Sequence, residues 1–147
     1  MSITKKTISG LKSLLEKNID AVKGFKSAAK IARNDTLTNF LQQKSEQRNL
    51  FAVQLSNIIL KHGGNSNIQS TYKGAAHRIW MDISTAISSN NDEAVLDACE
   101  TGERASVKEY DQFLDNHPMP AEIRNLLAEQ RKLIGMTLRK IIQLENQ

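Results

Sequence analysis

The sequence has little of what cross-links or interrupts a chain: one cysteine, two prolines and seven glycines in 147 residues. Because Cys99 has no second cysteine to pair with, a disulfide framework within the chain is excluded, and a lone thiol makes a poor zinc site. Cys99 lies on an apolar stripe with no histidine expected close enough to activate it, so we interpret it as a core residue. The scarcity of proline and glycine favours long helices.

Long hydrophobic runs and aromatic residues are also scarce. The longest apolar stretches span a few residues, against the roughly 20 that a membrane-spanning helix needs, and the N-terminal string MSITKKTISGLK contains no continuous apolar signal core. We therefore expect a cytoplasmic protein without a membrane span. Aromatic residues make up 5% of the chain, which leaves no stacking platform for single-stranded nucleic acid, and no DNA-binding motif is recognisable.

Charge is divided unevenly between the two halves of the chain. Residues 1–74 contain 12 lysines and arginines against 4 acids, whereas residues 75–147 contain 8 against 12. This asymmetry predicts either an anionic partner for the first half, or two halves that attract each other within the fold or across a homo-oligomer. The N-terminal lysines form the one cationic surface suited to nucleic acid or an anionic membrane, but without interleaved aromatics we do not expect a nucleic-acid partner.

Four long segments repeat apolar residues at the helical period, and no segment shows strand alternation. The punctuation predicts Asp35 as the N-cap of the second helix, Gly63-Gly64 as its C-terminal stop, and Pro120 as the first residue of the fourth. Short connections after the first and third helices make each pair an antiparallel hairpin. The four predicted helices cover about residues 4–33, 35–62, 92–116 and 120–144.

The link between the hairpins, residues 65–91, is far too long for a simple turn. We predict that it contains a short amphipathic helix of about 14 residues, which would cover about 21 Å, so that the extended remainder lets the chain cross the whole bundle. The chain is therefore predicted to be a single all-α domain over residues 1–147, a ferritin-like four-helix bundle with a long crossover. An up-and-down bundle with a decorated loop is the competing topology. On the predicted crossover helix, one apolar face contains Ala76, Ile79, Trp80, Ile83 and Ile87.

Several local strings carry a resemblance, and the most distinctive is His77-Arg78-Ile79-Trp80-Met81-Asp82 in the predicted crossover. The others are Asp20, Gly24-Phe25, Gln47-Arg48, Gly74, Glu100-Thr101-Gly102-Glu103, Tyr110 and Gln130. Over nearly the whole chain, these strings resemble a bacterial family of uncharacterised ferritin-like four-helix-bundle proteins, a domain of unknown function. The resemblance implies the fold and no established activity.

The residues that a ferritin-like di-iron centre needs are missing. Such centres use a Glu from each of two helices and a Glu-x-x-His pair from each of the other two, but this chain contains no Glu-x-x-His. Glu46 is followed at i+3 by Asn49 and Glu129 by Lys132, and the three histidines are not placed to converge at mid-bundle. We predict no metal ligands, no catalytic residue and no cofactor, and we keep an atypical iron or other metal site as the alternative.

A polar layer is expected at mid-bundle instead. Asn18, Arg48, Ser106 and Gln130 fall within the apolar stripes of their helices about halfway along, and Glu103 lies at the edge of its stripe. A buried arginine needs an anion, and Glu103 is the best candidate. The layer is either an internal salt-bridge and amide network that fixes helix register, or a set of donors for a small anionic ligand.

In the crossover, Trp80 is expected to anchor the short helix to the bundle because tryptophan contributes a large buried area. His77 and Arg78 project away from that face, where they are either solvated residues or a surface site for an anion.

From these patterns we expect an uncharacterised, non-catalytic bundle that acts as an interaction or structural protein and self-associates. The alternatives are a metal-dependent oxidoreductase or metal-binding protein with an atypical site, and a basic surface that binds nucleic acid or an anionic membrane. The sequence does not identify a small-molecule ligand.

Overall fold

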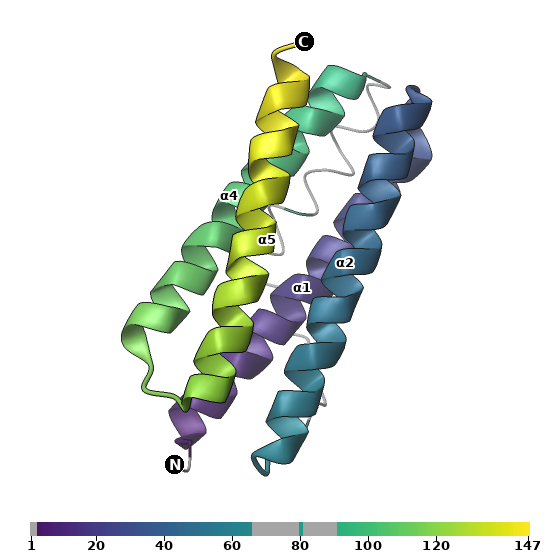
Figure 1. Cartoon of the computed structure of the whole chain (residues 1–147). Helices are drawn as coiled ribbons and strands as arrows, with labels where there is room; N and C mark the ends of the chain where they lie inside the picture. The colour runs from purple at the N-terminus through teal and green to yellow at the C-terminus, as the bar shows by residue number, and fades with distance from the viewer. Residues whose placement is uncertain (1–2, 66–79, 81–90) are drawn as a thin grey trace.

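The computed structural model describes residues 3–65, 80 and 91–147 (Figure 1). The predicted all-α class is confirmed, since the described residues contain four long helices and no strand. The crossover helix expected around residues 76–87 lies outside the described residues, apart from Trp80. No described helix is both long and apolar enough to cross a bilayer. The helices are α1 (Lys5–Ile31), α2 (Asp35–Lys61), α4 (Asp92–Asn116) and α5 (Ala121–Glu145).

Polar side chains cap the starts of α1, α2 and α4, and two of the expected helix starts need correction. Asn34, not Asp35, is the N-cap of α2: its side-chain oxygen accepts the backbone N–H of Leu37 at 3.1 Å, and Asp35 occupies the first turn, where its charge favours the helix dipole. Pro120 is the N-cap of α5 and not its first residue, because its backbone is extended at ψ 154°. Gly63 has φ 84° and ends α2 as expected.

The helices form two antiparallel hairpins, α1–α2 and α4–α5 (Figure 1). Asp92, at the start of α4, accepts the backbone N–H groups of Arg33 and Asn34 at 2.8 and 3.0 Å, just before α2 begins. At the other end of the bundle, Lys61 near the end of α2 pairs with Glu122 at the start of α5 at 2.8 Å. α2 and α4 therefore start at the same end and run parallel, which differs from an up-and-down bundle.

The apolar core is divided into two clusters along the bundle axis. One lies toward the N-terminal end of α1 and the C-terminal end of α2, and includes Leu11, Leu55 and Ile123, each 0% exposed. The other lies toward the C-terminal end of α1, and includes Phe25, Leu41 and Cys99. The buried thiol of Cys99 matches its expected core position, and burial raises its pKa, so it stays protonated.

Trp80 packs into the second cluster against two glycines from different hairpins. Its side chain is 4% exposed, and its ring lies 5.1 Å from that of Phe25. A Cβ at Gly24 of α1 or at Gly102 of α4 would collide with the indole, at 2.7 Å in the case of Gly102. The absence of a side chain at Gly102 therefore makes room for the Trp80 ring.

Replacing Gly102 with Ala should destabilise the protein by about 1–3 kcal/mol, because the indole must move in a packed core. Gly135→Ala on α5 is the matched control: its Cβ would meet only Arg131 Nη1 at 3.5 Å, so helix propensity should stabilise that variant by about 0.5–1 kcal/mol. Urea unfolding of both variants measures the difference. Equal stabilities would show that Trp80 does not occupy this space.

Candidate functional site

Five polar residues predicted at mid-bundle do lie together there, between the two apolar clusters. Each is at most 1% exposed, including Glu103, which we had placed at the edge of its stripe. They come from all four helices: Asn18 from α1, Arg48 from α2, Glu103 and Ser106 from α4, and Gln130 from α5.

Arg48 is the centre of this polar network. Its Nη1 donates to Glu103 Oε1 at 2.6 Å, its Nε to Asn18 Oδ1 at 2.7 Å, and its Nη2 to Ser106 Oγ at 3.1 Å. The guanidinium of Arg48 on α2 thus contacts α1 and α4. Glu103 supplies the anion that a buried arginine requires, as predicted. Charge-assisted bonds of this length are among the stronger hydrogen bonds in proteins.

Two residues that we did not assign to the layer extend the network to α5. Asn18 Nδ2 donates to the Tyr110 hydroxyl at 2.9 Å, which donates to Gln130 Oε1 at 2.7 Å. Gln130 Nε2 donates to Gln54 Oε1 at 3.0 Å. The sequence signal for Tyr110 is its hydroxyl at the same height as an asparagine and a glutamine, which we did not use.

Burial shifts the ionisation of the two acidic members. Desolvation raises the pKa of Glu103 to about 7, although the Arg48 charge opposes the shift. Desolvation likewise raises the pKa of Tyr110 to about 12, so the phenol remains a hydrogen-bond donor at neutral pH. The network therefore holds one permanent cation beside a carboxyl group that can gain a proton.

The network is satisfied by the chain's own side chains. Among the described residues, the buried side-chain atoms left without a hydrogen-bond partner are His62 Nε2 and Glu145 Oε1, and neither belongs to the network. Three surface cavities are lined by other residues. This arrangement favours a structural role over the anion-binding hypothesis.

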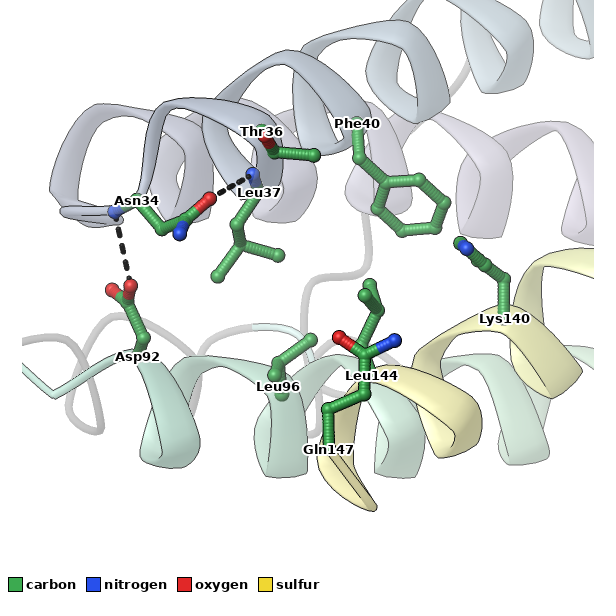
Figure 2. Close-up of a pocket in the computed structure, with 9 residues that line it drawn as sticks. All are labelled: Asn34, Thr36, Leu37, Phe40, Asp92, Leu96, Lys140, Leu144 and Gln147. Carbon is green, nitrogen blue, oxygen red and sulfur yellow. Dashed lines mark hydrogen bonds between the residues drawn. The ribbon is translucent and has the colours of Figure 1, made fainter.

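One of these cavities lies at the end of the bundle where α2 and α4 begin (Figure 2). Its volume is about 390 Å³. Leucines and a phenylalanine form its apolar surface, and Lys140 and Asp92 lie near opposite ends of it (Figure 2). The full lining is Asn34, Thr36, Leu37, Phe40, Asp92, Leu96, Lys140, Leu144 and Gln147.

The described residues contain one carboxylate cluster that could in principle hold a metal ion: Asp97, Glu100 and Glu145, each offering an oxygen within 4.8 Å of the others. It lies near the same end of the bundle, outside the polar network, and contains no imidazole. Arg104 already bonds Glu100 at 2.6 Å. Burial and the Glu100 carboxyl raise the pKa of Glu145 to about 7. The cluster thus lacks the ligand set of a di-iron centre.

The charge asymmetry of the sequence gives rise to ion pairs between the two hairpins. In the part of the chain that the structure describes, three ion pairs join the two hairpins, and in each the cation comes from the first half and the anion from the second. They are Lys17–Glu109 at 3.3 Å, Arg48–Glu103 at 2.6 Å and Lys61–Glu122 at 2.8 Å.

The predicted surface site at His77 and Arg78 lies outside the described residues. Of the other two histidines, His62 caps the end of α2, and His117 follows α4, where its ring stacks on Phe113. Both lie at the ends of helices, as expected, and neither reaches the polar network.

Comparison with known proteins gives a family and no activity. A family model described as "Domain of unknown function (DUF2383)" matches residues 6–116, three quarters of the chain. A search of curated proteins found no match.

The stability of the fold should depend on pH through Glu103. Because its pKa is higher in the folded chain than its usual value of 4.5, the folded state binds this proton more tightly, and the resulting stability is lost as pH rises through 7. Relative to Glu103→Gln, the wild type should lose on the order of 3 kcal/mol between pH 5 and pH 8. Urea unfolding across that range measures this, and a constant difference between the two proteins would contradict it.

Proposed function

The chain belongs to the family described as Domain of unknown function (DUF2383), and we propose that it is a non-catalytic, ferritin-like bundle that functions by protein interaction, associating with a second copy of itself. The ferritin-like assignment is supported by the two antiparallel hairpins with α2 and α4 parallel, which is the helix arrangement of ferritin-like bundles.

The non-catalytic assignment rests on how the polar residues are used. A catalytic centre presents reactive groups to a cleft, whereas the guanidinium of Arg48 and the carboxyl of Glu103 are 1% exposed and bonded to each other. Buried polar groups of this kind are known to specify register and assembly state.

The observation that carries the interaction function is the outer surface of α2. Leu50, Val53 and Leu60 are 54%, 49% and 54% exposed, on one side of the helix. Of the nine exposed residues between positions 39 and 60, Glu46 alone is charged. We call this surface the α2 face; it consists of Asn39, Gln42, Gln43, Glu46, Asn49, Leu50, Val53, Asn57 and Leu60. Depletion of charge around aliphatic side chains is typical of protein interfaces.

A second copy fits the α2 face better than it fits the outer surfaces of α1 and α4. α1 carries seven lysines against two acids, and α4 eight acids against two basic residues, so pairing either helix with its own copy would bring like charges together. The α2 face meets itself with little repulsion. In an antiparallel pair about a two-fold axis between positions 50 and 53, each Leu50 would contact the partner's Val53.

The available area limits the strength of this association. A 27-residue helix is about 40 Å long and about 10 Å wide, so one face supplies about 400 Å² per copy. The two copies together would bury about 800 Å², less than the roughly 1,200 Å² of stable specific interfaces, which predicts a weak, reversible dimer rather than an obligate one.

The alternatives find less support. The Asp97–Glu100–Glu145 cluster contains no imidazole, and Arg104 already occupies a carboxylate oxygen of Glu100. On α1, Lys17 is paired with Glu109 and Lys12 bonds Asn65, which reduces the cationic surface available to nucleic acid or a membrane.

The test is a concentration series by sedimentation velocity on the wild type and on Leu50→Glu/Val53→Glu. We expect a wild-type dimer with a dissociation constant between about 10 µM and 1 mM, and a variant that stays monomeric because four carboxylates would meet at the two-fold axis. Met136→Glu on α5, where the methionine is 48% exposed outside the α2 face, is the matched control and should dimerise as the wild type does. A monomeric wild type at millimolar concentration, or a dimeric double variant, would refute the proposal.

A further inference from the structure

The cavity at the end of the bundle has the properties of a binding site for a small amphipathic acid (Figure 2). None of its lining residues belongs to the α2 face or to the polar network, so the inference does not depend on the proposed self-association. Its volume of about 390 Å³ falls at the lower end of the range for ligand cavities, which suits a small molecule rather than a long lipid chain.

The apolar surface of the cavity is held open by the core behind it. Leu37 of α2 and Leu96 of α4 are 6% and 8% exposed and belong to the second core cluster, so they cannot move inward to close the space. Phe40 and Leu144 are partly buried against the same cluster and present the rest of their apolar surface to the cavity. An apolar group placed here would be removed from water on three sides, by α2, α4 and α5.

Of the two charged side chains that line the cavity, Asp92 is hydrogen-bonded within the fold and Lys140 is not ion-paired in the described part of the chain. Both carboxylate oxygens of Asp92 accept backbone N–H groups, those of Arg33 and Asn34, and this carboxylate also lies at the positive end of the α2 dipole. Lys140, in contrast, makes no ion pair with any described residue. The ammonium group of Lys44 lies 5.5 Å from the centre of the Phe40 ring and adds a second cation beside the cavity.

We propose that this cavity binds a small carboxylic acid with an aliphatic or aromatic body, which packs on Leu37, Phe40, Leu96 and Leu144 while its carboxylate pairs with Lys140. The apolar surface provides the binding energy, and the ammonium group selects an anionic head group over a neutral or cationic one. Asp92 at the far end of the cavity disfavours a second negative charge, so a monoacid fits better than a diacid.

Isothermal titration calorimetry with three ten-carbon probes tests the inference: decanoate and decyltrimethylammonium below their micelle-forming concentrations, and decanol below its solubility limit. Decanoate should bind at one site with a dissociation constant on the order of 0.1–1 mM, as expected for about a dozen non-hydrogen atoms. Decanol should bind at least about fivefold more weakly, because it forms no ion pair, and the ammonium probe should not bind measurably.

Variants locate the site. Lys140→Gln should weaken decanoate binding about five- to tenfold and leave decanol binding unchanged, whereas Leu144→Trp should abolish both by filling the cavity. Lys132→Gln, an exposed lysine on the same helix, removes the same charge outside the cavity and should bind decanoate like the wild type. The inference is overturned if decanoate does not bind at 5 mM, if the three probes bind equally, or if the two lysine variants behave alike.

Discussion

The structure depends on the burial of one guanidinium group. Arg48 is the largest of the fully buried side chains, and removing its charge from water is costly unless each nitrogen finds a partner at the right position. Its partners are on α1 and α4, and they connect through the Tyr110 hydroxyl to α5. An axial slide of any one helix by a turn would leave a charge or an amide unpaired at the centre. The apolar clusters on either side tolerate small shifts, because hydrophobic contact is not directional, whereas the polar network does not.

The same interaction relates the two hairpins to each other. Each hairpin is held internally by a short turn, but α1–α2 and α4–α5 meet only through side chains in the described part of the chain. The ion pairs that join them combine first-half cations with second-half anions, with Arg48–Glu103 at the centre and Lys61–Glu122 at one end. At the other end Asp92 binds the backbone that precedes α2, and Trp80 lies against a glycine from each hairpin. The outer face of α2 takes no part in these contacts between the hairpins, and the cavity beside Lys140 lies next to the Asp92 contact. We assign self-association to the first and ligand binding to the second.

Much of this organisation could be predicted from the sequence. The helical period located the four helices to within about two residues, because each buries one continuous stripe, and polar residues on those stripes at similar heights identified Asn18, Arg48, Ser106 and Gln130. The N-cap of α2 was assigned one residue late because Asn34 and Asp35 can both cap a helix. Tyr110 and Gln54 were not assigned to the polar network because the helical period does not show whether their polar atoms reach another helix. Only the distances between the helices decide which polar atoms meet. No sequence pattern predicts the Trp80–glycine contacts or the cavity, because both form where three elements come together.

The most direct test of the buried guanidinium is the free energy of unfolding of Arg48→Met, compared with Arg48→Met/Glu103→Leu, by urea titration at pH 8. The single replacement leaves the Glu103 carboxylate buried without its cation and should cost about 3–5 kcal/mol. The double replacement removes both charges and should return the stability to within about 1–2 kcal/mol of the wild type. An Arg48→Met protein as stable as the wild type, or a double variant no more stable than the single one, would contradict the account.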